Sequence, residues 1–384
     1  MEARRKSPLV DVLIPAFNAE RTIRQALASI QCQTIGNFRV IVVNDGSTDR
    51  TSELAHAAAD ADSRICVIDQ SNGGIVVARN RLIEHSTAPY LAMHDADDRS
   101  FPDRLERQLA YLEGHPDCVA VSGNAWNIDQ HGRRAGGRSH FGGDVEPDPY
   151  AIPSAEPYLP QPFVMIRRDA MMVVAGYREM TNAEDTDLYW RLLSVGRLHN
   201  LADIVGEYRM HAVSASSASA RNGRLSALHS QLAALSYRRR RSDVPDLEVT
   251  AETARQLAAS DDMEQMLACV SSQLDAAEIR YLRPAFAAKL LELASYRPYL
   301  LTDGDCRFIH DALPVAREGK SWQQRSLLVY QQAHILAKLL YHGRWREIAA
   351  FRASASVYAN ILPALTMRRG KALLQSWRNR PAPA

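Results

Sequence analysis

The sequence Tyr90-Leu-Ala-Met-His-Asp95-Ala-Asp97-Asp98-Arg-Ser-Phe-Pro-Asp103 decides the fold, because a short apolar run stops abruptly at three carboxylates. Residues 90–93 have the length and apolar character of a buried strand. In an extended backbone, side chains at positions i and i+2 share a face, so we expect Asp95 and Asp97 to converge while Asp98 turns away. The stretch therefore predicts a strand that brings two carboxylates to one point.

Two converging carboxylates suit a hard divalent cation. Mg²⁺ and Mn²⁺ take oxygen ligands and often use only one or two carboxylates, which leaves positions for water and substrate phosphates. The alternative is a polar turn that caps a helix beginning at 100–103, and a short motif taken alone favours this alternative. The position of the motif relative to the predicted strands has to decide between a metal site and a helix-capping turn.

The composition indicates a soluble globular protein, with 384 residues, 46% hydrophobic and 23% charged, long enough for two domains. A formal net charge of +2 gives no reason to expect a nucleic-acid partner. The five cysteines are scattered and form no Cys-x-x-Cys pair, so neither a disulfide framework nor a zinc site is expected. With no signal-peptide pattern and no apolar run approaching about eighteen residues, we expect a cytoplasmic protein without a membrane span.

Alternating strand and helix patterns precede the acidic stretch. Strands are predicted at residues 10–14, 38–43 and 65–68, and each is followed by a polar turn and by helical spacing. This alternation predicts βαβ units and a mostly parallel sheet flanked by helices, whose ligands bind at the carboxyl ends of the strands. The turns at those ends carry Asn18, Asp45, Asn72, and Asp95 with Asp97. Because the turns are expected at one edge of the sheet, the metal interpretation becomes the preferred one.

The rest of the N-terminal part continues this pattern. Further strands are predicted at 119–124, 163–166 and 204–210, and helices at 169–175 and 182–196. The Gly-x-Gly-x-x-Gly fingerprint is missing after the first strand, which argues against a nicotinamide or flavin dinucleotide. Residues 130–162 are predicted to be irregular, and the Ser/Ala-rich residues 212–220 are a candidate lid.

The C-terminal part has a different pattern, rich in Ala and Leu at helical spacing. Helices are predicted at 225–237, 250–270, 276–296, 322–341, 345–358 and 366–377. We therefore predict an α/β domain at 1–222 and an all-α domain at 223–384. The run Arg238–Arg241 near this boundary is interpreted as a solvated linker.

Several motifs, in the right order, resemble those of the family-2 glycosyltransferases, which have the GT-A fold, a Rossmann-like sheet flanked by helices. The matching segments are Val12-Leu-Ile-Pro15-Ala-Phe17-Asn18, Val43-Asn-Asp45-Gly-Ser-Thr-Asp49, Asn72-Gly73-Gly with Ala78-Arg79-Asn80, Asp95-Ala-Asp97-Asp98, Glu184-Asp185 and Tyr208-Arg-Met-His211. The resemblance covers about the first 220 residues and is absent from the C-terminal third.

The resemblance implies roles for these residues. Those expected to bind the nucleotide-sugar are Pro15, Phe17, Asn18, Asp45, Asn72, Gly73, Arg79 and Asp95. It also implies that Asp97, completed by His211, binds Mn²⁺ or Mg²⁺ on the diphosphate, and that Asp185, beside Glu184, is the general base of an inverting transfer. His94 and Leu82 depart from the family pattern, which leaves the fine donor geometry open. The Gln-x-x-Arg-Trp signature of processive members is absent, so one sugar per binding event is expected.

Each of these residues also has an ordinary structural interpretation. Asp45 fits a turn with a helix cap, and Glu184-Asp185 after Asn182 fits a capping box. A lone His211 is more often a core or surface histidine than a ligand. Arg79 fits a solvated helix face.

The sequence thus predicts a metal-dependent glycosyltransferase that moves one hexosyl or N-acetylhexosaminyl group from a nucleotide-diphosphate sugar, with UDP favoured, to an acceptor hydroxyl in cell-surface polysaccharide or glycan synthesis. The alternatives are a sugar-nucleotide pyrophosphorylase and a non-catalytic nucleotide-sugar-binding protein. The acceptor is expected to be a glycan or a lipid-linked molecule at a membrane surface. If the acceptor is lipid-linked, a basic C-terminal helix is expected to lie peripherally on the inner face of the cell membrane. Its basic residues are Arg368, Arg369, Lys371, Arg378 and Arg380. Packing of this helix on its own domain, or homo-oligomerisation through the all-α domain, is the other possibility.

Overall fold

A computed structural model describes residues 7–180, 182–211, 219–317 and 322–361 of the chain. The chain divides into two compact units. The first contains the described parts of residues 1–147, 156–180 and 184–212, and the second contains those of 148–155, 181–183 and 213–384. The second unit thus includes two short segments from within the N-terminal part of the sequence, in addition to the C-terminal helices.

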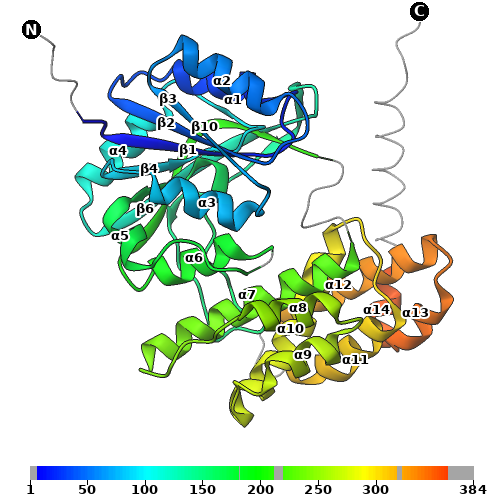
Figure 1. The fold of residues 1–384 in the computed structure, drawn as a ribbon. Helices are drawn as coiled ribbons and strands as arrows, with labels where there is room; N and C mark the ends of the chain where they lie inside the picture. Colours follow the sequence, from blue (N-terminus) through cyan, green and yellow to red (C-terminus); the bar gives the residue numbers. More distant parts are fainter. Residues whose placement is uncertain (1–6, 181, 212–218, 318–321, 362–384) are drawn as a thin grey trace, which may run out of the picture. The chain divides into compact units, whose positions relative to one another are not determined.

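Among the described residues, the first unit is built on one mixed sheet (Figure 1), with the strand order β3-β2-β1-β4-β9-β6-β10-β5. The short strands β7 and β8 pair with β6 and β10. The strands are β1 (Val10–Ala16), β2 (Phe38–Asp45), β3 (Ile65–Gln70), β4 (Tyr90–Met93), β5 (Arg99–Ser100), β6 (Cys118–Ile128), β7 (Arg134–Arg138), β8 (Gly143–Asp144), β9 (Met165–Arg167) and β10 (Arg197–Arg209). Neighbours among β1 to β4 are parallel, β9 is antiparallel to β4 and β6, and β10 is parallel to β6.

Helices cover both faces of this sheet. Successive residues of a strand point to opposite faces, and in the central strands the residues on both faces are apolar, so each face needs helices to bury it. Val12 and Ile14 pack in one core with α1 (Ile23–Gln31), α2 (Thr51–Ala61) and α4 (Arg104–Gly114). Leu13 packs in the opposite core with the helices α3 (Ile75–Glu84), α5 (Arg168–Val173) and α6 (Glu184–Leu192). Figure 1 shows α1 and α2 on one side of the sheet and α3 and α6 on the other. Burying each large apolar side chain contributes about 1.5–3 kcal/mol.

The predicted fold class is confirmed. The four N-terminal strands form in the expected order with helices between them, and their carboxyl ends share one edge of the sheet. The chain has the GT-A arrangement in its first unit and helices throughout the described part of its C-terminal region.

Two details of the α/β part differ from the prediction. Ser100 does not begin a helix: it lies in β5, which pairs with β10, and the helix α4 begins only at Arg104. Residues 130–162 are not wholly irregular, since β7, β8 and the 3₁₀ turn η1 (Gln161–Phe163) lie there. The strand β7 has an exposed Arg-Ala-Gly-Gly-Arg sequence without apolar alternation, which hid it from a pattern search.

The described helices of the second unit are α7 (Ala220–Arg241), α8 (Ala251–Ala259), α9 (Met263–Ser271), α10 (Ala276–Tyr296), α11 (Asp303–Arg317), α12 (Trp322–Tyr341), α13 (Trp345–Phe351) and α14 (Ala355–Ala359). The prediction of one helix at 250–270 is wrong, because Asp262 caps the start of a separate helix by accepting a hydrogen bond from the Gln265 amide. The helix α11 was missed.

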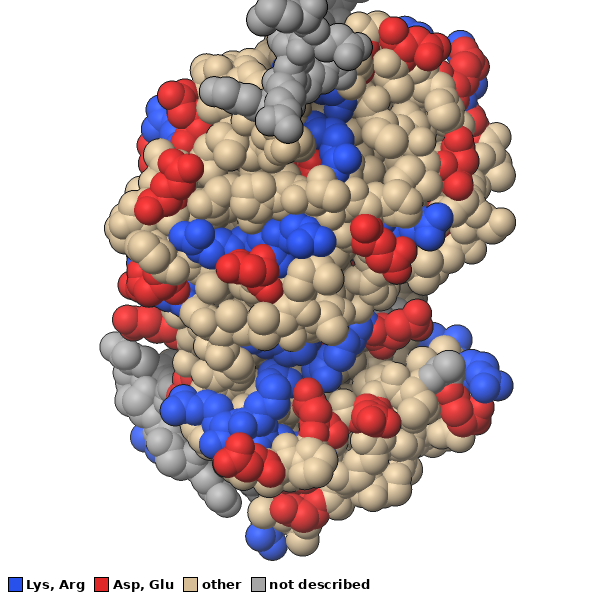
Figure 2. Space-filling view, turned by 60° about the vertical axis from the view of Figure 1, so that its left-hand side comes forward, with Lys and Arg blue, Asp and Glu red and all other residues tan. Residues whose placement is uncertain are grey.

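The interpretation of Arg238–Arg241 as a solvated linker is also wrong. These residues end α7, and Arg239 forms an ion pair with Glu278 of α10. Arg238 lies over the rings of Tyr150 and Tyr281, at 4.8 and 4.5 Å from their centroids. On the face shown in Figure 2, Lys and Arg side chains gather on the second unit with acidic side chains among them.

Some predictions fall on residues that the structure does not describe. The candidate lid lies mostly in residues 212–218, and the basic helix at 366–377 lies in residues 362–384, so both are outside the described residues. Within the described chain, no helix is both long and apolar enough to span a membrane.

Gly206 provides a test of the sheet packing beside the acidic stretch. A Cβ atom at Gly206 would lie 2.5 Å from the Arg99 carbonyl oxygen and would collide with the Phe163 ring. We predict that Gly206→Ala lowers the free energy of unfolding by about 1–3 kcal/mol, the usual cost of overpacking. Gly36→Ala is the control, since a Cβ there meets nothing within 4 Å. Equal chemical-denaturation midpoints for the two variants would contradict this packing.

Candidate active site

The acidic stretch at the end of β4 is a tight turn. The Asp98 amide donates to the Asp95 carbonyl oxygen at 3.2 Å, so the chain reverses instead of remaining extended. As a result, one carboxylate oxygen from each of Asp95, Asp97 and Asp98 lies within 4.8 Å of the others. The expectation that Asp98 turns away is therefore wrong, and three carboxylates converge where two were predicted.

The carboxylates of this acidic turn, defined as residues 95–98, lie in an environment that disfavours their charge. Burial raises the pKa of Asp95 to about 6, with Arg79 opposing this shift and Asp97 adding to it. Burial and then Asp97 raise the pKa of Asp98 well above its ordinary value. One oxygen of Asp98 accepts the Arg209 amide at 2.7 Å, but the other, Oδ2, is buried without a hydrogen-bond partner among the described residues.

His211, near the C-terminal end of the first unit's sequence, contacts the acidic turn. Its Nε2 atom lies 2.6 Å from Asp97 Oδ2, although the two residues are 114 positions apart in the sequence. Three crowded carboxylates, a buried oxygen without a partner and an imidazole nitrogen beside them fit a divalent cation such as Mn²⁺ or Mg²⁺. Asp97 and His211 are the residues best placed to hold it.

The turns after β1 and β2 are joined by hydrogen bonds. Asn18 has a φ of 49°, and its side-chain oxygen accepts the Thr48 amide at 2.9 Å, while its own amide donates to Ser47 Oγ at 3.0 Å. Pro15 is buried within β1, and Phe17 follows with 52% of its surface exposed. Exposed aromatic surface at this edge is available to a ligand.

Asp45 connects the turns after β2 and β3. Its Oδ1 atom accepts from Gln70 Nε2 and the Gly73 amide, both at 2.8 Å, and its Oδ2 atom accepts the Gly74 amide at 2.9 Å. The side chain of Asn72 donates to the Asp45 carbonyl oxygen at 2.9 Å. A carboxylate offers about four acceptor positions, so one position of Asp45 remains for a ligand donor.

Arg79 links the acidic turn to the start of α6. Its guanidinium is buried, with Nη1 2.9 Å from Glu184 Oε1 and Nη2 3.7 Å from Asp95 Oδ1. Its Cζ atom lies 5.3 Å from the centroid of the Tyr177 ring. Burial alone would lower the pKa of Arg79, but Tyr177 and the two carboxylates outweigh burial and raise it. Arg79 is thus a buried link between two carboxylate groups and does not lie on a solvated helix face.

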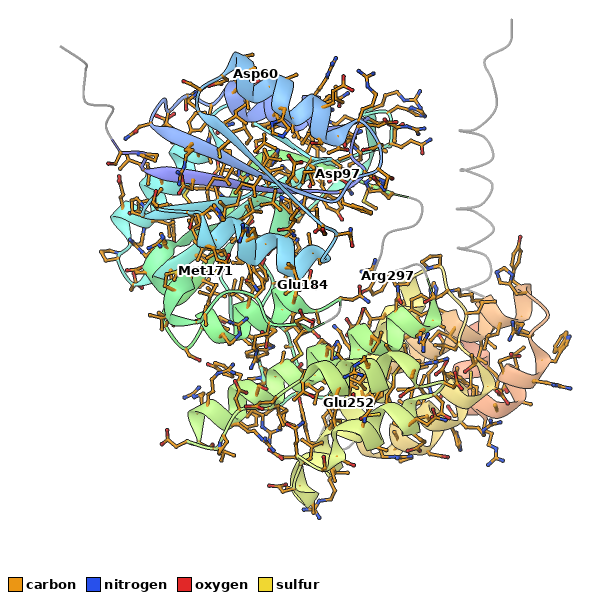
Figure 3. All side chains as sticks on the ribbon, in the orientation of Figure 1. Asp60, Asp97, Met171, Glu184, Glu252 and Arg297 are labelled. Carbon is orange, nitrogen blue, oxygen red and sulfur yellow. The ribbon has the colours of Figure 1, made fainter. Side chains whose placement is uncertain are left out.

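The two adjacent acids of α6 have different surroundings. Burial and the neighbouring Asp185 raise the pKa of Glu184, while its ion pair with Arg79 opposes the shift. Asp185 is only half-buried, and the hydrogen bond found at its Oδ1 atom comes from the Thr186 amide, at 2.7 Å. Figure 3 labels Glu184 together with Asp97 of the acidic turn in the first unit. Both acids are half-buried, and the difference between them is that Arg79 forms an ion pair with Glu184.

Comparisons with known proteins show which family the chain belongs to. The family model described as glycosyl transferase family 2 matches residues 11–174. EpsE of Bacillus subtilis strain 168, a protein named as a glycosyltransferase, is 32% identical over 208 residues, which span 53% of this chain and 73% of EpsE. This chain belongs to glycosyl transferase family 2.

Other relatives of this family-2 glycosyltransferase extend the comparison. The amylovoran biosynthesis glycosyltransferase AmsE of Erwinia amylovora is 26% identical over 52% of this chain and 76% of AmsE. Matches to two further Bacillus subtilis glycosyltransferases span only 33% and 26% of those proteins. A crystal structure of Staphylococcus aureus TarS has a TM-score of 0.51 at 16% identity, covering 94% of this chain and 92% of that one. This last likeness concerns the fold alone.

Sequence reasoning missed three side chains that the structure places at the site of this glycosyltransferase. The side chain of Asp98 was expected to point away from Asp95 and Asp97, and no role was predicted for Tyr177 or Arg209. Tyr177 carries no motif signal, whereas Arg209 stands two positions before His211 and could have been suspected from that spacing. The direction of Asp98 is decided by the local turn, whereas Arg209 is placed by contacts over long sequence separations.

The link through Arg79 leads to a pH-dependent prediction. Arg79→Met leaves Glu184 buried without its cation, so we expect a loss of about 3–5 kcal/mol in the free energy of unfolding near pH 8. The pKa of Glu184, already raised, rises further, so the folded state holds a proton at low pH that the unfolded state has lost. The loss should therefore be smaller at pH 5 than at pH 8, as measured by urea denaturation.

The double variant Arg79→Met/Glu184→Gln is the matched control, because it removes the unpaired charge as well. It should recover part of the stability at pH 8. An equal loss at pH 5 and pH 8 in the single variant would contradict the proposed ion pair.

Proposed function

We propose that this family-2 glycosyltransferase is an inverting, metal-dependent enzyme that transfers one sugar from a UDP-sugar to an acceptor hydroxyl. The observation that carries the proposal is the link through Arg79. This side chain contacts the acidic turn at Asp95 and the start of α6 at Glu184, directly before Asp185. A group that would bind the donor and a group that would take a proton are thereby held together.

The donor side is the edge formed by the first four parallel strands. When bound, a divalent cation would offset the charge of the diphosphate leaving group. Asp97 and His211 would hold this cation, and Asp95 would approach the ribose. The remaining acceptor position of Asp45 is available for an N–H group of the base, and UDP is proposed because Asp45 and Arg79 match the positions that contact uracil in the family that the sequence resembles. Pro15, Phe17, Asn18, Asn72, Gly73 and Arg79 would complete the nucleotide-sugar site.

The acceptor side depends on Asp185. Glu184 is engaged by Arg79 at 2.9 Å, so its carboxylate is not free to take a proton from an acceptor. Asp185 lies in the first turn of α6, next to Glu184. Asp185 would accept the hydroxyl proton as the acceptor oxygen attacks the anomeric carbon from the side opposite the diphosphate, which inverts the configuration.

The proposed class of acceptor is inferred from the names of related glycosyltransferases. AmsE is named for amylovoran biosynthesis, which supports a glycan acceptor in polysaccharide synthesis for this chain too. Incubating the full chain with a panel of nucleotide-sugars and measuring donor hydrolysis would identify the sugar. Donor binding without any hydrolysis or transfer would instead support a non-catalytic nucleotide-sugar-binding protein.

The helical second unit has no residue in the proposed reaction, so its role is considered separately. We propose that it serves the acceptor, a membrane surface or oligomerisation, in a cytoplasmic protein. The basic residues from Arg368 to Arg380 that would contact anionic lipid lie outside the described part of the chain. Sedimentation with anionic liposomes, with and without the residues after Leu365, separates the membrane role from the other two.

The role of Asp185 gives the sharpest prediction about the reaction. Asp185→Asn preserves the side-chain shape but cannot accept the acceptor proton. Transfer should fall by about 10²–10⁴, the usual contribution of a positioned general base, while UDP affinity stays almost unchanged. The measurement is the initial rate of sugar transfer beside a UDP titration.

Asp185→Ala tests the purely structural alternative. If Asp185 only stabilised the helix start, Asn would retain near-normal transfer, and Ala would cost about 1 kcal/mol of stability. Near-wild-type turnover in Asp185→Asn would refute the assignment of the base.

A further inference from the structure

Arg209, the last residue of β10, has a buried side chain for which the reaction described above gives no role. Only 2% of its surface is exposed. Within the described residues, no carboxylate oxygen lies close enough to its guanidinium to form an ion pair, so this cation is held by neutral oxygens. Burying a cation in this way has a cost in free energy, which a merely structural contact could avoid with an apolar side chain.

The side chain of Arg209 reaches three separate parts of the first unit. Its Nε atom donates to the Asp97 carbonyl oxygen at 2.7 Å. Its Nη1 atom donates to the carbonyl oxygens of Asp129 and Gln130, at 3.1 and 3.3 Å, and its Nη2 atom donates to Gln25 Oε1 at 3.1 Å. The guanidinium therefore joins the acidic turn to the β6–β7 hairpin and to α1.

The main chain of Arg209 acts on the same turn. Its amide donates to Asp98 Oδ1 at 2.7 Å, and this bond holds the carboxylate whose other oxygen has no hydrogen-bond partner in the described part of the chain. Two residues later, His211 Nε2 lies 2.6 Å from Asp97 Oδ2. Fixing Arg209 against the carbonyl oxygen of Asp97 therefore also fixes the distance between Asp97 and His211. The planar guanidinium, with its donors in a fixed fork, can hold several carbonyl oxygens at once.

We propose that Arg209 is a positioning residue that clamps Asp97 and His211 in the arrangement needed to bind a divalent cation. The inference rests on the proposed metal-dependent function, because it concerns the same cation. It adds a residue that touches neither the cation nor the substrate. Outer residues that orient metal ligands affect metal affinity about 10–100-fold when they are changed.

The sign of the effect separates positioning from simple charge. Arg209 is a cation beside a cation site, so removing it should strengthen Mn²⁺ binding if its charge were the only thing that mattered. If Arg209 positions the ligands, removing it should weaken Mn²⁺ binding in spite of the relieved repulsion. Lys keeps the charge but is a compact ammonium without the planar fork, so Arg209→Lys should also weaken binding if positioning dominates.

The experiment measures free Mn²⁺ by electron paramagnetic resonance in titrations of the full chain with UDP present. We expect the Mn²⁺ dissociation constant to rise about 10–100-fold in both Arg209→Met and Arg209→Lys. Arg134→Gln is the matched control, since Arg134 on β7 is exposed, lies over Trp126 and pairs with Glu207 of β10, which is outside the acidic turn. Its dissociation constant should equal that of the wild type.

Thermal melts in parallel show whether each variant is folded, and Arg209→Lys keeps the test decisive if Arg209→Met does not fold. Wild-type or tighter Mn²⁺ binding in a folded Arg209 variant would overturn the clamp while leaving the proposed function intact. If the wild type itself bound no Mn²⁺ with UDP present, the metal-dependent function and the clamp would both be rejected.

Discussion

The confinement of three carboxylates in one four-residue turn is the constraint on which the rest of the site depends. Like charges at this spacing repel, and burial makes the repulsion stronger. Arginines surround the turn: Arg79 reaches Asp95, Arg209 bonds to Asp97, and Arg104 donates to the Met93 carbonyl oxygen at 2.6 Å directly before the turn. The fold thus holds in place a concentration of negative charge that a divalent cation would complete.

The parallel arrangement of the first four strands explains why the placement of the turns that follow them could be predicted. Asp45 and Asn72 follow neighbouring strands, so knowing the strand order was enough to expect them at one edge, and they are in fact hydrogen-bonded. Asp98 could not be placed, because its direction depends on a turn instead of an extended chain. Arg209 could be suspected from its spacing to His211, but its contacts could not be predicted, because its side-chain partners lie from 79 to 184 positions away. The break near Asp262 was missed because helical spacing continues across it.

Arg79 also separates the roles of two adjacent acids that the sequence left equivalent. Both acids are half-buried in the first turn of α6, but an ion pair at 2.9 Å engages Glu184. A single buried cation therefore contacts both the acidic turn and the start of α6. Changes at Arg79 should affect the donor and acceptor sides together, since neither ion pair can move without the other.

The central claim is that the acidic turn binds a nucleotide diphosphate through a divalent cation, and titration calorimetry of UDP tests it most directly. The account predicts UDP binding in the presence of Mn²⁺ that weakens on adding chelator, weaker binding of GDP, and a loss of about tenfold or more in Asp97→Asn with Mn²⁺ present. Equal UDP affinity with Mn²⁺ and with chelator, or equal affinity for UDP and GDP, would contradict it.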